Sequence, residues 1–237
     1  MARPVVLLLH AFPLDSRMWE LQQEALESAG YHALAPDLPG PGCEKTMREW
    51  AERVLHVADG PLVPVGVSMG GYLAFELWRR AGERIRALVL AGTRAGPETD
   101  ESRRGRDVSI RVLGEDGVPA LWEGLERRLF APGASTDVVA RAREIALEQG
   151  AVRLQAALES IRDREDSRPT LATIAVPVLV VAGEEDQVAA ASESEAMVRE
   201  LPNARLVRIP GAGHLPPLEQ PERFNAALLS FLAEVVR

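Results

Sequence analysis

Short apolar runs alternate with helix-length amphipathic stretches along this chain of 237 residues. That alternation is typical of a parallel sheet with crossover helices. The first run, Val5–Leu9, is continuously apolar, as expected for a strand that is covered on both faces. Five further strands are expected at residues 32–36, 62–67, 86–91, 178–182 and 206–209. The sequence therefore predicts an α/β fold with a mostly parallel sheet of about six strands flanked by helices.

The alternation stops after Gly92. From about residue 100 to residue 168 no strand-like run occurs, while Leu121, Leu125 and Leu129 recur at helical spacing. Strands resume at residue 178, and a last helix is expected at residues 222–236. We therefore expect a core domain formed by residues 1–99 and 169–237, with residues 100–168 as a helical insertion after the fourth strand.

Composition and charge narrow the class of protein. Hydrophobic residues make up 46% and charged residues 26% of the chain, close to the average of globular domains. The net charge of −8 argues against nucleic acid or an anionic membrane as the main partner. A single cysteine, Cys43, excludes an intramolecular disulfide and a cysteine-rich metal site. The run Val5–Leu9 is too short for a membrane span or a signal peptide, so we expect a cytoplasmic protein.

A candidate nucleophile follows the third expected strand, in the segment Gly66-Val67-Ser68-Met69-Gly70-Gly71. A serine on a sharp strand-to-helix turn has a strained backbone and needs small neighbours, which explains the flanking glycines. The turn places the hydroxyl of Ser68 beside a helix N-terminus, where developing negative charge is favoured. The alternative is a glycine-rich turn without chemistry, and the strand–helix context favours the nucleophile.

A serine hydroxyl is a poor nucleophile without a base, so a histidine must reach it. His214 is the candidate, because it lies in a glycine-containing loop between the last expected strand and the final helix. A plain surface residue is the alternative interpretation of His214. The other histidines are more easily explained as structural: His10 ends the first strand, His32 begins the second, and His56 lies in a helix.

The third member of such a triad is a carboxylate that orients the imidazole. Asp186 follows the fifth expected strand and is favoured because it lies deepest in its loop, whereas Glu184 and Glu185 are expected to be solvated. Loops at one edge of a parallel sheet converge in space. We therefore expect Ser68, Asp186 and His214 to form a catalytic triad.

Charge that develops on a substrate carbonyl oxygen needs hydrogen-bond donors already in place. The backbone N–H of Met69, at the start of the helix after Ser68, is one expected donor. The N–H of Phe12, in the loop after the first strand, is the other. Together they are expected to form the oxyanion hole.

These segments resemble those of the α/β-hydrolase superfamily, from Val5 to the C-terminus. The segments 68–72 (Ser-Met-Gly-Gly-Tyr), 91–96 (Ala-Gly-Thr-Arg-Ala-Gly) and 218–222 (Leu-Glu-Gln-Pro-Glu) are similar to the bacterial branch described as 3-oxoadipate enol-lactonase-like. The resemblance implies the α/β-hydrolase fold, a serine esterase or lactonase activity, and a helical cap over the site. It implies no cofactor, and the sequence contains no zinc, dinucleotide or phosphate-loop motif.

The chain departs from the family pattern at two places. Ala11 stands where the family usually has glycine, which adds a methyl group beside the oxyanion loop. The first parallel strand comes almost at the start of the chain, without the antiparallel hairpin that usually precedes it. Such a sheet has a bare edge, which a second copy or flanking loops would cover, so we expect a monomer or a homodimer.

The expected cap supplies candidates for the substrate pocket. Trp122, Leu125 and Leu129 are candidates to line it, and the alternative is that they only pack the cap against itself. An arginine cluster also lies in the insertion, formed by Arg103, Arg104 and Arg106. It is either a site for a carboxylate substrate or an ordinary solvated charge run.

The leading hypothesis is a serine hydrolase that cleaves a small carboxylic ester or lactone through an acyl-enzyme. A second hypothesis keeps the triad and changes the reaction to carbon–carbon hydrolysis, perhydrolysis or a lyase step. A third is a signalling receptor for a small ligand that has kept a hydrolase pocket. The expected partner in every case is a small molecule, with no metal ion, nucleic acid or membrane.

Overall fold

A computed structural model describes residues 3–40, 42 and 44–236, and Cys43 lies outside the described residues. Within this part of the chain six strands form one sheet in the order β2-β1-β3-β4-β5-β6, and each neighbouring pair is parallel. The strands are β1 (Val5–Leu9), β2 (His32–Leu34), β3 (Leu62–Val67), β4 (Leu88–Ala91), β5 (Val178–Gly183) and β6 (Ala204–Ile209). The predicted fold class, with its parallel sheet of six strands, is confirmed.

The inner strands β1, β3, β4 and β5 are apolar because the sheet has a core on each face, whereas the edge strands β2 and β6 carry the polar residues His32, Arg205 and Arg208. In β1, Leu7 and Leu9 join one buried cluster, while Val6 and Leu8 join the other. The same division holds in β4, where alternate residues point to opposite faces. A continuous apolar run is therefore the sequence of a strand buried on both sides.

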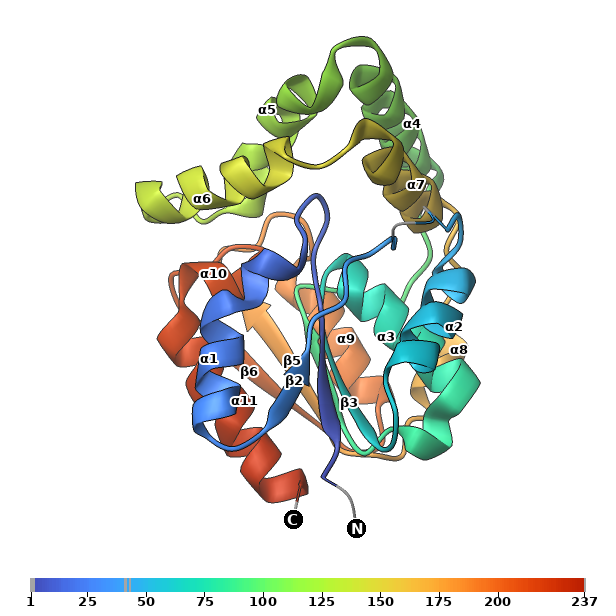
Figure 1. Cartoon of the computed structure of the whole chain (residues 1–237), viewed down its shortest axis with the longest axis vertical. Helices are drawn as coiled ribbons and strands as arrows, with labels where there is room; N and C mark the ends of the chain where they lie inside the picture. Colours follow the sequence, from blue (N-terminus) through green and yellow to red (C-terminus); the bar gives the residue numbers. More distant parts are fainter. Residues whose placement is uncertain (1–2, 41, 43, 237) are drawn as a thin grey trace.

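Helices cover both faces of this sheet (Figure 1). One face packs against α2 (Met47–Val57), α3 (Met69–Ala81), α8 (Arg168–Leu171) and α9 (Ala191–Glu200). The other packs against the short 3-10 turn η1 (Ser16–Trp19), α1 (Glu20–Ser28) and α11 (Pro221–Val235). The short α10 (Pro216–Glu219) leads into α11. This arrangement leaves the carboxyl edge of the sheet free for the loops that carry the candidate site.

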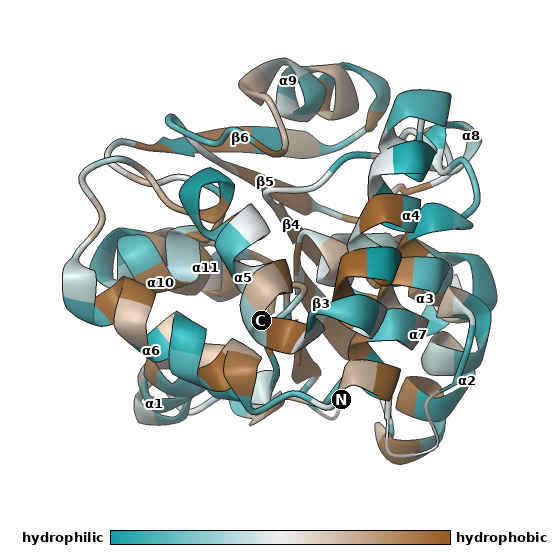
Figure 2. Ribbon diagram, turned by 90° about the horizontal axis from the view of Figure 1, so that it is seen from above, coloured by the Kyte–Doolittle hydropathy of each residue, from teal (hydrophilic) through white to brown (hydrophobic). Residues whose placement is uncertain are grey.

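Four helices between β4 and β5 lie over that edge (Figures 1 and 2). They are α4 (Asp100–Glu115), α5 (Gly117–Leu129), α6 (Thr136–Leu147) and α7 (Ala151–Arg162), called here the helical insertion. The predicted limits of the insertion, residues 100 and 168, coincide with the starts of α4 and α8. On the core side, Asp15 accepts a buried hydrogen bond of 2.7 Å from the amide of Gln149, which attaches the insertion beside the loop after β1.

Four strands have boundaries that differ from those expected: the fourth begins at Leu88, two residues late, the fifth extends by one residue to Gly183, and the second and sixth also differ. The second strand ends at Leu34, two residues early, because it pairs only with β1 and its last partner there is Leu7. The chain then leaves the sheet, and the N–H of Leu38 bonds to a side chain instead of to a strand. The last strand begins earlier than expected, at Ala204, because β6 pairs with β5 along its full length.

The helices are of moderate length, and the longest in the described part of the chain is α4, with 16 residues. Across residues 3–40, 42 and 44–236, none combines the length and the apolar character needed to cross a bilayer. No group of three or more His, Cys, Asp or Glu side chains that could hold a metal ion is found among the described residues.

Candidate active site

Ser68 occupies the sharp turn between β3 and α3. Its φ of 52° is the only positive value at a non-glycine residue in the described chain, and such a conformation persists only where the surroundings impose it. Here the N–H of Ser68 donates to the carbonyl of Ala91 at 2.9 Å, and the hydroxyl of Thr93 donates to the carbonyl of Ser68 at 2.9 Å. Ser68 is thereby held rigidly at the carboxyl edge of the sheet.

The glycines around Ser68 are required by close approach of neighbouring atoms. A Cβ on Gly70 would lie 2.0 Å from the carbonyl oxygen of Leu9, and one on Gly66 would lie 2.4 Å from that of Gly70. A Cβ on Gly71 would lie 2.5 Å from the hydroxyl oxygen of Thr93. Such contacts are too short for any side chain, so α3 can start against β1 and β4 only with glycine at these positions.

His214 and Asp186 form a buried pair. The Nδ1 of His214 lies 2.9 Å from Oδ2 of Asp186 and 3.1 Å from Oδ1, and each side chain is only 1% exposed. Asp186 Oδ1 also accepts the N–H groups of Val188 and Ala189. Burial opposes ionisation of Asp186, but His214 and these N–H groups outweigh it and hold its pKa below the usual value. With Nδ1–H directed at a carboxylate, Nε2 of the neutral imidazole is left to accept a proton.

A partly buried carboxylate, Glu219, fixes the loop that carries His214. Its Oε2 accepts the N–H of Gly213 at 2.9 Å and of Ala131 at 2.7 Å, and its Oε1 accepts the N–H of Leu215 at 3.0 Å. Burial raises the pKa of Glu219, although the three N–H groups act in the opposite direction. Glu219 therefore ties both neighbours of His214 to the chain between α5 and α6.

The loop after β1 is held by His10. The Nε2 of His10 accepts the N–H of Leu38 at 2.8 Å, and its Nδ1 lies 3.0 Å from the carbonyl oxygen of Ala11. Complete burial lowers the pKa of His10 to about 4, so the imidazole is neutral and donates through Nδ1. These bonds fix the backbone that leads to Phe12, whose N–H is one of the two expected oxyanion donors.

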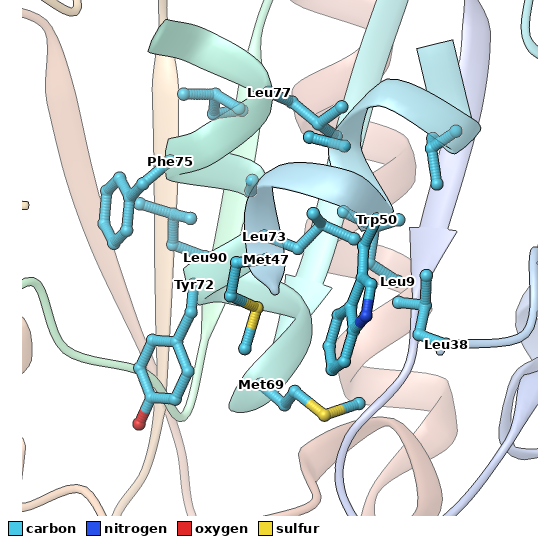
Figure 3. Close-up of a cluster of buried hydrophobic side chains, with 14 of the residues drawn as sticks. Leu9, Leu38, Met47, Trp50, Met69, Tyr72, Leu73, Phe75, Leu77 and Leu90 are labelled. Atoms are coloured by element: carbon cyan, nitrogen blue, oxygen red, sulfur yellow. The ribbon is translucent and has the colours of Figure 1, made fainter. Parts of the chain in front are cut away.

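Phe12 and Met69 lie differently with respect to the site. The side chain of Phe12 lines the cavity that also contains Ser68. The side chain of Met69 is buried in the core beside Trp50 (Figure 3). Met69 can therefore act at the cavity only through its backbone N–H, which has no partner within the helix because it belongs to the first residue of α3.

Ser68 and His214 line one cavity of about 340 Å³ between the sheet edge and the helical insertion. Leu125 and Leu129 of α5 are part of its wall. Trp122 is not among the described residues that line it. Its indole is buried against Phe130, with ring centroids 6.2 Å apart, and its Nε1 donates to Glu126 within the same helix. The structure therefore does not meet the expectation that Trp122 lines the pocket, because its ring packs inside the insertion.

The three arginines of α4 have separate environments. Arg106 lines the cavity. Arg103 forms a surface ion pair of 3.2 Å with Asp163, and Arg104 is exposed. Of the three, only Arg106 is placed to meet a ligand in the cavity.

Sequence reasoning did not place Tyr72, Arg94, Glu98 or Arg128 in the cavity wall, although Tyr72 and Arg94 lie in segments that carry the family resemblance. Arg94 and Glu98 follow the carboxyl end of β4, which is the kind of position that drew attention to Asp186. Their position after the end of a strand was therefore the sequence feature from which these two residues could have been predicted. Arg128 lies on an amphipathic helix, where nothing in the sequence distinguishes a cavity-facing arginine from a solvated one.

A family model described as the alpha/beta hydrolase family matches residues 6–227. The chain belongs to this family. It is 31% identical over 238 residues to the protein named putative non-heme bromoperoxidase BpoC of Mycobacterium tuberculosis, covering 92% of this chain and 90% of that protein. It is 26% identical to 3-oxoadipate enol-lactonase 2 of Acinetobacter baylyi, covering 95% and 87% of the two chains.

The solved structures include a thermophilic esterase from Thermogutta terrifontis, described as malate bound. It is 32% identical, the match covers 100% of this chain and 92% of the esterase, and the TM-score is 0.90. The expected membership of the α/β-hydrolase superfamily, with likeness to its enol-lactonase and esterase branch, is confirmed.

Proposed function

We propose that this chain hydrolyses a carboxylic ester or a lactone of a small molecule through an acyl-enzyme on Ser68. One observation carries the proposal: Ser68 of the strained turn and His214, which is paired with the buried carboxylate of Asp186, line the same cavity. The relatives support the reaction class, carboxylic ester hydrolysis, since one is named an esterase and another an enol-lactonase.

Acylation begins when the hydroxyl oxygen of Ser68 attacks the carbonyl carbon of the substrate. His214 accepts the serine proton at Nε2, and the Asp186 carboxylate stabilises the imidazolium through Nδ1–H. The backbone N–H groups of Phe12 and Met69 stabilise the negative charge on the tetrahedral intermediate. His214 then gives the proton to the leaving alcohol, and the acyl group remains on Ser68.

Deacylation repeats these steps with water as the nucleophile. His214 takes a proton from water, hydroxide adds to the acyl carbon, and the proton returns to Ser68 as the acid leaves. Residues of α4 and α5 line the cavity, and we expect the insertion to limit the access of bulk water to it. In this proposal the helical insertion acts as the cap of the site.

Perhydrolysis is the second candidate function, and the relative named as a bromoperoxidase favours it. Hydrogen peroxide in place of water would take the acyl group from Ser68 and leave as a peracid, so the same triad serves both reactions. Ester turnover that is equally fast without peroxide supports hydrolysis. Acyl transfer that depends on added peroxide supports the second candidate.

The test is a panel of p-nitrophenyl esters of increasing acyl length, together with several lactones, measured with the native chain and with Ser68→Ala. We expect Ser68→Ala to lower kcat by about 10⁴-fold or more. Ser109→Ala is the matched control, since Ser109 is a second serine of the cavity wall whose hydroxyl donates to a carbonyl of its own helix. The control should keep most of the activity.

Either of two results would contradict the proposal. One is a folded Ser68→Ala variant that keeps most of the native activity. The other is native protein that turns over no ester and no lactone in the panel.

A further inference from the structure

We infer that the cavity accepts substrates that carry a free carboxylate, and that Arg94, Arg106 and Arg128 form its binding site for that group. The inference rests on the proposed function, because it names the substrate class of the same site. All three arginines contribute to the wall of the cavity that contains Ser68 and His214. Arg94 comes from the loop after β4, Arg106 from α4 and Arg128 from α5.

One oxygen of the carboxylate already present at this site, Oε1 of Glu98, is paired with a different arginine, whereas Oε2 is buried without a hydrogen-bond partner among the described residues. Glu98 has a fully buried side chain, and Arg164, 4% exposed, forms an ion pair with its Oε1. Arg164 also donates to the carbonyls of Ile161 and Gly96 and stacks on the ring of Tyr72, 4.1 Å from the ring centre. The Glu98–Arg164 pair therefore accounts for the buried charge and for the attachment of this loop.

Arg94 and Arg106 are additional cations around the same carboxylate oxygen. Their guanidinium groups lie 3.0 Å and 3.7 Å from Oε1 of Glu98, and their side chains are 22% and 21% exposed. Burial opposes ionisation of Glu98, but the charges of Arg106, Arg164 and Arg94 together hold its pKa below the usual value. One negative charge thus faces three positive ones, and two of the three belong to the cavity wall.

The arginines of the cavity wall keep unused hydrogen-bonding capacity. Within the described residues, Nε of Arg94 is buried without a hydrogen-bond partner, and Arg128 has no ion pair. The single ion pair of Arg106 in that part of the chain is the long one to Glu98. A buried donor without a partner costs free energy, so Nε of Arg94 is expected to have an acceptor in the functional state. Arg106 and Arg128 reach solvent, and their guanidinium groups are free to meet a ligand.

The balance of charge at the cavity is opposite to that of the protein. Three arginines line the cavity against two glutamates, Glu98 and the exposed Glu101, while the whole chain carries a net charge of −8. A positive wall above the nucleophile attracts anionic substrates and repels cationic ones. The planar guanidinium group also matches a carboxylate through two parallel hydrogen bonds.

The size of the cavity limits the ligand to a small one. A volume of about 340 Å³ lies at the lower end of the range for small-molecule sites. The substrate class that fits is a monoester of a short dicarboxylic acid, or a lactone that carries a carboxylate. Its ester carbonyl would lie at Ser68 and its carboxylate at the arginines.

The experiment compares two p-nitrophenyl esters of glutaric acid that share one leaving group. In the first the distal end is a free carboxylate, and in the second it is a methyl ester. We expect the native chain to prefer the carboxylate substrate in kcat/KM. Arg106→Gln should lower that preference about tenfold or more, mainly through KM, because a charge-assisted pair is lost.

The control is Arg104→Gln, which removes the same charge from the exposed face of the same helix two residues away. It should keep the native preference. Arg128→Gln is the second test variant, because Arg128 is exposed and its replacement does not disturb the buried Glu98 pair. A thermal unfolding curve for each variant confirms that it is folded.

The inference is overturned if the native chain prefers the neutral ester, or if Arg106→Gln and Arg128→Gln both keep the native preference. If either result is found while hydrolysis still depends on Ser68, the proposed function is retained and only the carboxylate site is rejected. If neither ester is hydrolysed, the carboxylate site is tested without turnover, by measuring the binding of glutarate with calorimetry. Weaker binding to Arg106→Gln than to Arg104→Gln supports the site, and equal or absent binding overturns it.

Discussion

The two walls of the cavity are built in different ways. On the sheet side, Ser68 and His214 are held by backbone geometry, buried hydrogen bonds and glycines that no other residue can replace. On the side of the insertion, Arg106 and Arg128 are long, partly exposed side chains on helices. In the proposals made above, the sheet side supplies the catalytic groups together with Arg94, and the insertion side supplies the other two arginines that select the charge of the ligand. Changes on the sheet side should therefore remove activity or folding, and changes on the other side should alter selectivity.

The largest effect is expected at Asp186. Asp186→Asn keeps the shape of the side chain but removes the charge that orients and stabilises His214, so kcat should fall about 10⁴-fold. Ester hydrolysis at neutral pH measures the loss. Glu184→Gln is the control, because Glu184 is an exposed residue of the same loop. A folded Asp186→Asn variant with nearly native kcat would show that the buried pair is only structural.

The glycines of the serine turn should be the least tolerant positions for folding. A methyl group on Gly70 would meet the carbonyl oxygen of Leu9 at 2.0 Å. Gly70→Ala is therefore expected to destabilise the protein by about 3 kcal/mol, through forced movement of α3 from the sheet. Urea unfolding measures this change, and native stability in the variant would show that the turn is not constrained as described.

Glu219 tests the junction between the two walls. Gln at this position offers one acceptor oxygen where the carboxylate accepts three N–H groups, so at least one buried N–H loses its partner. Glu219→Gln should cost about 2 kcal/mol of stability and lower kcat more than it changes KM, because the loop of His214 is less well held. Glu222→Gln, an exposed change at the start of α11, should alter neither quantity.

Because of His10, the stability of the sheet side is expected to depend on pH. Its folded pKa of about 4 is below the usual value of a histidine, so the unfolded chain takes up a proton first as the pH falls. The stabilisation that comes from neutral His10 is fully present above the pKa of this histidine in the unfolded chain. It is lost as the pH falls toward its pKa in the folded protein. The expected loss from His10 between about pH 7.5 and pH 5 is about 2 kcal/mol.

Urea unfolding at those two pH values checks this expectation. His10→Gln removes the titrating group, and its stability should change less between them than that of the native chain. His56→Gln is the control, since His56 is exposed on α2. A steep loss that persists in His10→Gln would assign the pH dependence to other groups.

The smallest effect is expected within the insertion. Gly114 is exposed in α4, and an added Cβ would meet no atom within 4 Å. Gly114→Ala should stabilise the protein by about 0.5–1 kcal/mol, because alanine loses less conformational entropy in a helix. A clear loss of stability in urea unfolding would mean that the insertion is as tightly constrained as the serine turn.

The sheet side was predictable from the sequence because its signals are local. The Gly66–Gly71 segment directly reflects the close approach of α3 to the sheet. Asp186 and His214 follow strand ends, and the structure brings them within hydrogen-bond distance. Their catalytic roles stay predictions, as does the assignment of Phe12 and Met69 to the oxyanion hole.

The insertion side was less predictable because its contacts join distant parts of the chain. Glu98 pairs with Arg164, 66 residues away, and Glu219 bonds to Ala131, 88 residues away. Helical spacing indicated which residues of α5 face inward. It could not separate the cavity wall, where Leu125 and Leu129 lie, from the interior of the insertion, where Trp122 lies.

The most direct test of the central claim is covalent labelling of Ser68 with a fluorophosphonate, followed by peptide mapping in a mass spectrometer. The account predicts one equivalent of label on Ser68, with ester hydrolysis falling in proportion to labelling. It also predicts no label in Ser68→Ala and much slower labelling in His214→Ala. Label on a different residue, or hydrolysis that continues in fully labelled protein, would contradict the account.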